Sequence, residues 1–270
     1  MIKTFNIINP WRSQYTAVLD KAGTAGYTRP TYAQMLVQNA MVRSLVQKGV
    51  WDLMDALYVF YTNGDSNYSL INWLHPYETA FGVPSLISTP TFASNTGWTT
   101  NGTSTAINTD WAPDDGVVMT GINNASLYFD SIPVTGSVNE YRCGGRPNLG
   151  STNPSNEVNP HVDTRVYTGL RSTTALGSTL AKNGTSSILI NNNSGGDQDL
   201  WKDGVYIETI ANTYNGVANA QPLYIGANNA GGTTQFYGRP TIHRVAMFGG
   251  NVHAVAAQQD LIVDTYLANA

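Results

Sequence analysis

The chain has 270 residues, of which only 12% are charged, and its formal net charge at pH 7 is −4. Proteins that bind nucleic acids normally present a basic face to the phosphates. This sequence has no cluster of lysines and arginines, so its composition excludes a nucleic-acid partner and predicts a surface of mostly neutral polar groups.

Residues 1–30 predict an N-terminal arm. Prolines and glycines interrupt the segment, and it offers one short helix at residues 13–22. It holds too few apolar residues for a core of its own, so if ordered it must pack on the main domain or on a partner. The N-terminus lacks the apolar core of a signal peptide, and no apolar run approaches the about 20 residues of a membrane helix. We therefore expect a soluble protein made in the cytosol, without membrane insertion.

Residues 31–61 carry apolar side chains spaced three and four apart, the spacing of an amphipathic helix. Gly49 interrupts the run before Trp51, which predicts two consecutive helices or one bent helix. Thr31 follows Pro30 and is the expected N-cap. The composition changes at residues 62–66, although helices before this boundary and strands after it could share one core.

Short apolar segments separated by Gly, Pro, Asn and Thr follow, as is typical of a β-sandwich or barrel. The Asp203-Gly204 pair between two alternating segments predicts a tight hairpin. Near the C-terminus we expect a strand at 222–227, a turn at 228–232, a long strand at 236–248 and a closing helix over 252–267. The expected strands are 69–73, 91–93, 97–99, 106–108, 117–121, 126–130, 139–142, 161–168, 170–172, 187–191, 198–202, 204–210, 223–226 and 236–248.

Several motifs carry a resemblance to a known family. They are Gly49-Val50-Trp51, Ile71-Asn72-Trp73, Gly97-Trp98, Trp201-Lys202-Asp203-Gly204, Tyr224-Ile225-Gly226 and Phe236-Tyr237-Gly238. In this order they resemble bacteriophage virion proteins with a concanavalin A-like, laminin-G-type jelly roll, over roughly residues 27–267. The resemblance implies a mainly β protein: an arm (1–30), a helical pair (31–62) and a jelly-roll β-sandwich (63–270) that a short C-terminal helix closes.

Catalytic carboxylates are sparse. Glycoside hydrolases place two carboxylates across a cleft, often at alternate positions of one strand. Here Glu140, Asp163 and Glu208 each stand alone, and no Gly-X-Ser-X-Gly motif marks a nucleophile. The four histidines, His75, His161, His243 and His253, lack the spacing of metal ligands, and His243 alternates with Arg244 as a sheet residue would. We predict no catalytic residues and no enzyme activity.

Two acidic pairs are weak candidates for a calcium site. Asp114 and Asp115 precede Gly116, and Asp197 and Asp199 would share one face of an extended chain. Carboxylate oxygens suit Ca²⁺, but an Asp-Gly turn explains the first pair more simply. We therefore predict no metal site and no cofactor. Cys143 is the only cysteine. It excludes an intrachain disulfide and is expected to be a small buried or half-buried residue.

Aromatic side chains suggest a carbohydrate-binding alternative, since their faces stack on sugar rings. Polar turns flank Trp98, Trp111, Tyr214 and Tyr237, which are therefore the candidates. The remaining tryptophans of interest, Trp51, Trp73 and Trp201, lie in apolar patterns and are expected in the core. No ligand-binding residue follows from the sequence alone.

The leading hypothesis is a non-enzymatic component of a phage particle, a capsid decoration, head-fibre or tail-fibre module displayed on the virion surface. The resemblance implies other virion proteins as partners and a homo-oligomer, with a trimer expected from the family. The alternative is a lectin-like adhesin that recognises host glycans, and a polysaccharide-degrading enzyme ranks third.

Overall fold

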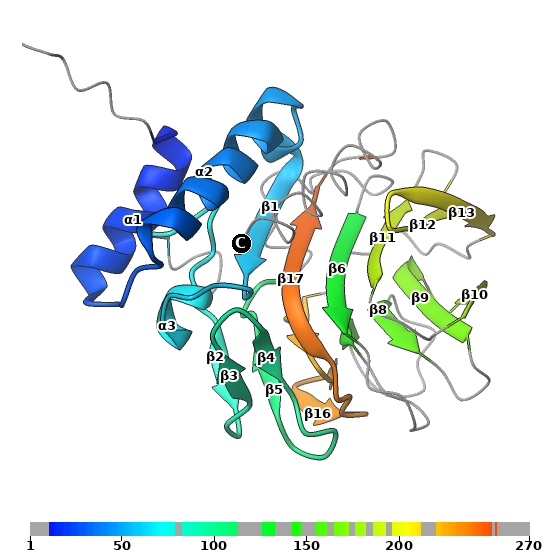
Figure 1. Cartoon of the computed structure of the whole chain (residues 1–270). Helices are drawn as coiled ribbons and strands as arrows, with labels where there is room; N and C mark the ends of the chain where they lie inside the picture. The colour runs from blue at the N-terminus through cyan, green and yellow to red at the C-terminus, as the bar shows by residue number, and fades with distance from the viewer. Residues whose placement is uncertain are drawn as a thin grey trace, which may run out of the picture.

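The computed structural model describes residues 11–78, 83–112, 126–132, 142–146, 155–160, 165–172, 176–181, 186–192, 196–211, 220–249 and 252. Across these residues the protein is mainly β, with two helices near the N-terminus and two stacked sheets, as expected for a jelly-roll β-sandwich. The helices lie beside the β1 end of the first sheet (Figure 1). The predicted fold class is thus confirmed.

Helix α1 spans Ser13–Ala25 and ends at Gly26, whose φ of 74° places it in the left-handed region that glycine tolerates. Helix α2 spans Tyr32–Gln47, and the hydroxyl of its N-cap Thr31 accepts a hydrogen bond from the Gln34 N–H at 3.4 Å. Both the helix at the arm and the N-cap were predicted. None of the helices described in the structure is long and apolar enough to cross a membrane.

The sequence predicted that helix would continue after Gly49, either as a second helix or beyond a bend, and this prediction is wrong. A single 3₁₀ turn at Trp51–Leu53 leads into strand β1, Met54–Val59, which pairs antiparallel with β17. All six residues of β1 are buried, because one face of the strand packs on the helices and the other on the second sheet. A strand buried on both faces reads as a continuous apolar run and so satisfies a helical pattern by chance.

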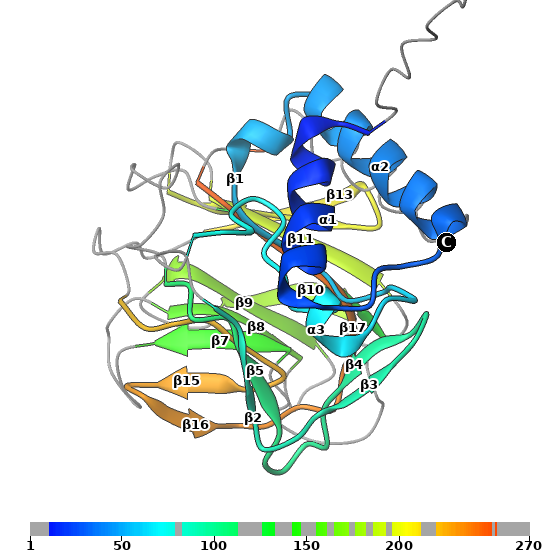
Figure 2. The same cartoon turned by 90° about the vertical axis from the view of Figure 1, so that its left-hand side faces the viewer.

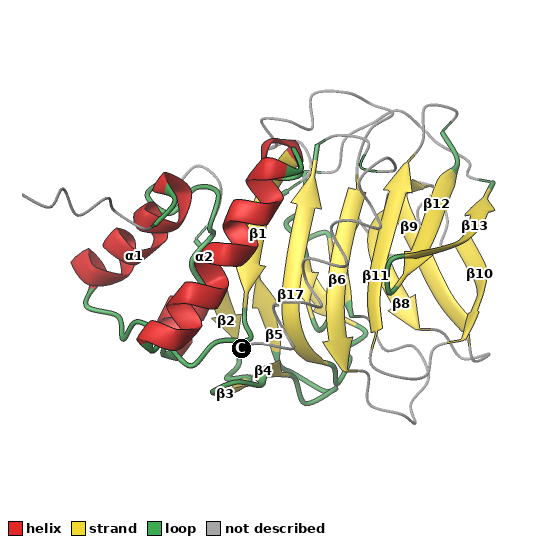
Figure 3. Ribbon diagram, turned by 45° about the horizontal axis from the view of Figure 1, so that its top comes forward, coloured by secondary structure: helices red, strands yellow, loops and turns green. Residues whose placement is uncertain are grey.

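The first sheet has eight strands among the described residues. Seven follow the order β13-β12-β11-β6-β17-β4-β3, and β1 is the eighth. Strand β17 pairs with β6 along one edge, while β4 and β1 share its other edge. Figure 3 shows the strands from β1 to β13 side by side, with α2 next to β1. The bounds are β3 Thr91–Ala93, β4 Gly97–Thr99, β6 Ser126–Ile132, β11 Ser186–Asn192, β12 Gln198–Lys202, β13 Val205–Ile210 and β17 Thr241–Phe248.

The second sheet has nine described strands. Seven follow the order β10-β9-β8-β7-β14-β5-β2, and the β15–β16 hairpin joins through a parallel pairing of β15 with β7. This sheet lies below the first in the side view (Figure 2). The bounds are β2 Ser85–Ile87, β5 Ala106–Asn108, β7 Cys143–Arg146, β8 Ser155–Pro160, β9 Arg165–Ser172, β10 Leu176–Ala181, β14 Tyr224–Ile225, β15 Asn228–Ala230 and β16 Thr233–Gln235.

Several predicted strand positions need correction. Residues 69–73 form the end of the short helix α3, Ser66–Ser69, and a loop, because Asp65 caps the helix through its side chain. The expected turn at 228–232 contains strand β15, the long final strand begins only at Thr241, and the two segments at 161–172 merge in β9. Strands β2, β7, β8, β10 and β16 were missed; the strand predicted at 139–142 ends just before β7. The expected strand at 117–121, residues 139–141 and the closing helix beyond Val252 lie outside the described residues.

The Asp203-Gly204 hairpin is confirmed. Strands β12 and β13 pair directly on either side of it, with Lys202 opposite Val205. Both turn residues have positive φ, 50° and 72°, as a type I′ turn requires. Glycine supplies the second of these angles without strain.

Alternate residues of the first sheet feed two apolar cores. On one face Leu57, Tyr128 and Ala246 pack with residues of α1 and α2. On the other, Tyr58, Phe129 and Val245 pack with residues of the second sheet, including the buried Cys143. The helical core draws on residues from all three predicted segments, 1–30, 31–62 and 63–270. The chain therefore forms three layers, helices, sheet and sheet, with the first sheet in the middle.

Candidate functional site

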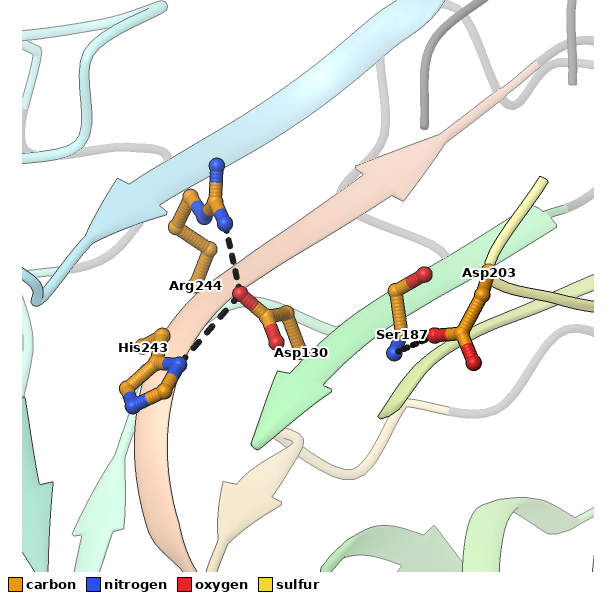
Figure 4. Close-up of polar contacts among 5 residues, drawn as sticks. All are labelled: Asp130, Ser187, Asp203, His243 and Arg244. Carbon is orange, nitrogen blue, oxygen red and sulfur yellow. Dashed lines mark hydrogen bonds and ion pairs between the residues drawn. The ribbon is translucent and has the colours of Figure 1, made fainter. Parts of the chain in front are cut away.

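A cluster of buried charges lies on the helix-side face of the first sheet. Asp130 on β6 accepts a hydrogen bond from the Arg244 Nη2 at 2.6 Å, and the His243 Nδ1 lies 3.5 Å from the same oxygen (Figure 4). A register shift between Ile242 and Arg244 leaves two residues of β17 opposite Asp130. Such a β-bulge re-aims side chains, and here the histidine and the arginine both approach one carboxylate.

The Arg244 guanidinium contributes most to the ionisation of Asp130. Burial by itself would raise the pKa of this carboxyl. The charges of Arg244 and His243, together with the hydrogen bond from Arg244, outweigh burial and lower the pKa to about 2. Asp130 and Arg244 are 2% and 1% exposed, so they form a buried ion pair that no solvent-borne substrate reaches.

The order of groups across the strands also excludes a serine nucleophile in this cluster. Ser187 on β11 lies opposite Asp130, so the carboxylate stands between the serine and His243. A catalytic triad instead needs the histidine between the serine and the acid. The backbone N–H of Ser187 donates to Asp203 Oδ1 at 2.9 Å (Figure 4), which ties β11 to the hairpin turn. The cluster therefore links neighbouring strands and has no catalytic geometry.

The acids singled out in the sequence are not brought together. Glu208 accepts hydrogen bonds from the Thr179 backbone N–H and hydroxyl at 2.5 and 2.9 Å, which joins β13 to β10. Asp199 is buried and accepts from the Thr209 hydroxyl at 2.6 Å, whereas Asp197 is half-buried. No group of three metal-ligating side chains occurs within the described part of the chain. Asp114, Asp115, Glu140 and Asp163 lie outside it, as do His161 and His253.

The predicted sugar-stacking tryptophans are buried, so that expectation is wrong. Trp98 and Trp111 are each 2% exposed and belong to the core between the sheets. The Trp98 Nε1 donates to Ser69 Oγ at 2.8 Å. Tyr237 is half-buried against the small core around Tyr224, and Tyr214 lies outside the described residues.

The aromatics predicted in the core behave as expected for the most part. Trp51 and Trp73 are buried among the helices and β1. Trp201 is half-buried at the margin of the same core and contacts Tyr206 with ring centroids 5.5 Å apart. The flanking polar turns around Trp98 and Trp111 misled the sequence prediction because short strands in a sandwich place core residues immediately beside turns.

A groove of about 150 Å³ opens between α1, the α3 region and the segment that leads into β2. Its walls combine apolar and aromatic side chains with a few polar groups, the composition typical of ligand sites. The lining residues are Lys21, Tyr27, Asn67, Leu70, Ile71, Asn72, His75, Pro76, Tyr77, Glu78, Val83 and Pro84.

Asn72 lines this groove and carries an amide whose oxygen and nitrogen are used differently. Its Oδ1 accepts from the backbone N–H groups of Leu57 on β1 and Leu74, at 3.2 and 3.1 Å. These two bonds fix the orientation of the amide, because only the oxygen can accept them. The Nδ2 is buried and has no hydrogen-bond partner among the described residues. A buried donor in this state destabilises the fold by about 1–3 kcal/mol, which a ligand oxygen would offset.

The charged side chains of this groove differ in their exposure to solvent. Lys21, from α1, is half-buried, and its ammonium group makes no hydrogen bond or ion pair with any residue that the structure describes. Glu78 is exposed at the rim, and its carboxylate lies 3.3 Å from the His75 Nδ1. Tyr77, which is 54% exposed, stands at the rim with Glu78.

Among these residues, only His75 was weighed from the sequence as a possible metal ligand, and Ile71 and Asn72 were named only as part of a motif. The groove forms because α1 packs beside α3. Lys21 and Asn72 are far apart in the sequence, so no local pattern could show that both line it. The only local signal was the Ile71-Asn72-Trp73 motif, in which a polar residue separates two core side chains. An Asn at such a position is typical of a buried amide that bonds the backbone.

No protein-family model matches the chain, and no curated protein is similar to it. Solved structures share its fold. Trypanosoma rangeli sialidase in complex with sialic acid aligns with a TM-score of 0.54 at 8% identity, over 86% of this chain and 39% of that one. A mutant of the same sialidase that displays trans-sialidase activity aligns with a TM-score of 0.51 at 10% identity over the same shares.

A smaller structure, the CBM40 of Ruminococcus gnavus IT-sialidase bound to α2,3-sialyllactose, aligns with a TM-score of 0.40 at 12% identity. That alignment covers 53% of this chain and 82% of the module, and it carries no argument at this score. The chain spans about two fifths of the T. rangeli proteins. At these identities the likeness describes the β-sandwich and says nothing of the ligand.

Proposed function

We propose that this chain is a non-catalytic recognition module that binds a glycan in the groove between α1, α3 and the segment before β2. The observation that carries the proposal is the groove itself, in which the Asn72 Nδ2 donor lies unpartnered near an exposed tyrosine ring. Sugars are recognised by this combination of an aromatic face and fixed hydrogen-bonding groups.

A catalytic role has little support. The carboxylates of Asp130, Asp199 and Glu208 are each engaged by neighbouring side chains or backbone. Glycoside hydrolysis needs two carboxyl groups facing one cleft, and among the described residues the groove contains only Glu78. We therefore propose binding without turnover.

We further propose that the module is displayed on a phage particle, as a capsid decoration or a fibre component, and that it assembles as a trimer. The support is the sequence likeness to virion jelly rolls and the scarcity of charged residues, 12% of the chain. Mass spectrometry of purified particles tests the location, and absence of the protein from them would refute it. Light scattering of the purified protein tests the trimer.

A glycan array with a matched pair of tyrosine variants tests the binding function. Tyr77→Ala removes a groove tyrosine that is 54% exposed, whereas Tyr32→Ala removes a tyrosine on α2 that is 62% exposed and outside the groove. We expect at least a tenfold loss of affinity in the first variant and none in the second. Equal binding by both variants, or no binding by the wild type at high avidity, would refute the proposal.

A further inference from the structure

We propose that the groove selects a carboxylate-bearing sugar, with Lys21 and Asn72 as the residues that hold the carboxylate. This inference rests on the proposed glycan-binding function and adds the chemical class of the ligand. It starts from the two donors that the fold leaves available, the Lys21 ammonium and the Asn72 Nδ2.

The Asn72 amide acts as a donor because its oxygen is already used. Two backbone N–H groups occupy the Oδ1, one of them from β1 in the central sheet. The side chain is 4% exposed, so the sheet holds the amide rigidly. The Nδ2 therefore offers N–H groups of fixed direction, which suits an acceptor such as a carboxylate oxygen.

Lys21 supplies the positive charge. It lines the groove from α1, is half-buried, and has no acidic partner in the described part of the chain. A partly desolvated ammonium binds a carboxylate more strongly than it binds a neutral hydroxyl, because the carboxylate carries a full opposite charge and the Coulomb attraction grows as water is excluded.

The acidic residue of the groove forms no ion pair with Lys21 in the described part of the chain. Glu78 is exposed at the rim and faces His75 at 3.3 Å. A carboxylate there accepts hydrogen bonds from hydroxyl groups, of which every sugar has several. An acidic sugar thus satisfies both ends, with its carboxylate toward Lys21 and Asn72 and its hydroxyls toward Glu78. A neutral sugar leaves Lys21 without an anion, and an acidic peptide lacks the hydroxyls.

The experiment compares acidic polysaccharides with their carboxyl-reduced forms, in which each carboxylate becomes a hydroxymethyl group. Polygalacturonate, hyaluronan and polysialic acid serve as probes, with hexaglutamate as a peptide anion. We expect at least one acidic polysaccharide to bind ten times more tightly than its reduced form, and hexaglutamate to bind weakly.

Three variants test whether Lys21 and Asn72 cause the preference for the acidic polysaccharide over its reduced form. Lys21→Gln removes the charge, and Asn72→Asp keeps the oxygen that accepts from β1 while replacing the donor with an anion. Each is expected to lower affinity for the acidic probe at least tenfold, with little effect on the reduced one. Lys48→Gln removes an exposed lysine at the C-terminal end of α2 and is expected to change nothing. Thermal melting identifies any variant that is misfolded, and Lys21→Gln alone then decides the result.

The outcomes separate this inference from the proposed function. Equal affinity for acidic and reduced forms would overturn the ligand class while leaving glycan binding in place. A preference for the acid that survives Lys21→Gln would overturn the site, and tight binding of hexaglutamate would overturn the sugar. Binding of no polysaccharide and no array glycan would overturn the proposed function and this inference together.

Discussion

The buried cluster around Asp130 lies on the first sheet, and the groove around Asn72 contacts that sheet through a hydrogen bond to β1. The two polar sites differ in how their side chains are paired. In the cluster, Arg244 and His243 converge on a single carboxylate and both contact its Oδ2. In the groove, the Asn72 amide bonds the backbone with its oxygen only, and the Lys21 ammonium has no partner among the described residues.

The difference teaches where to look for function in a chain with few charges. A charge that is paired and buried stabilises the structure or fixes the position of strands. A donor that is held rigidly and left unpaired lowers stability slightly and is retained where it meets a ligand. We therefore expect substitutions in the cluster to change folding, and substitutions in the groove to change binding.

The largest expected effect comes from breaking the ion pair. Arg244→Met leaves the buried Asp130 carboxylate without its main partner and should lower the free energy of unfolding by about 3–5 kcal/mol. Urea denaturation measures this change. The double variant Asp130→Leu/Arg244→Met should recover most of the loss, because no charge is then buried alone. A single variant as stable as the wild type would show that the pair contributes nothing.

The pH dependence of stability should follow from the same carboxylate. The pKa of Asp130 is about 2 in the folded protein, compared with about 3.9 in an unfolded chain. A lowered pKa gives stability that is present above the unfolded value and is lost as the pH falls through the folded one. We expect Asp130 to contribute about 2 kcal/mol at pH 5 and almost nothing below pH 2.

Denaturation curves of the wild type and Asp130→Asn between pH 5 and pH 2 test this. The two stabilities should converge as the pH falls, and a constant difference would contradict the assignment.

A smaller effect should distinguish the two buried tryptophans that the sequence presented as equivalent. Trp98→Phe removes the hydrogen bond from Nε1 to Ser69, whereas Trp111→Phe removes an indole Nε1–H that has no partner among the described residues. We expect the first variant to be less stable than the second by about 1 kcal/mol. Thermal or urea denaturation of both proteins provides the comparison. Equal stabilities would show that the Ser69 bond has no net effect.

The smallest effect on folding is expected in the groove. Lys21→Gln removes a half-buried charge that has no described partner, so the free energy of unfolding should change by no more than about 0.5 kcal/mol. Urea denaturation beside the wild type measures it. A loss of several kcal/mol would mean that Lys21 supports the fold, and the contrast between the two polar sites would fail.

Much of the architecture could be predicted from local patterns. The Thr31 N-cap, the Asp203-Gly204 hairpin and most short strands depend on residues that are near one another in sequence. Strand β1 could not be distinguished from a helix, because its burial on both faces is a property of the three-layer packing. The buried state of Trp98 and Trp111 likewise depends on the opposite sheet.

The sequence by itself determined a mainly β sandwich with helices at its N-terminal end, because alternation, turn residues and helix caps act over a few positions. Only the tertiary structure decided which polar groups are paired. The register of β6 against β17 places Asp130 beside Arg244. The packing of α1 near α3 brings Lys21 to the groove that Asn72 lines. Both arrangements depend on contacts between residues that are distant in sequence, and such contacts leave no periodic pattern in the chain.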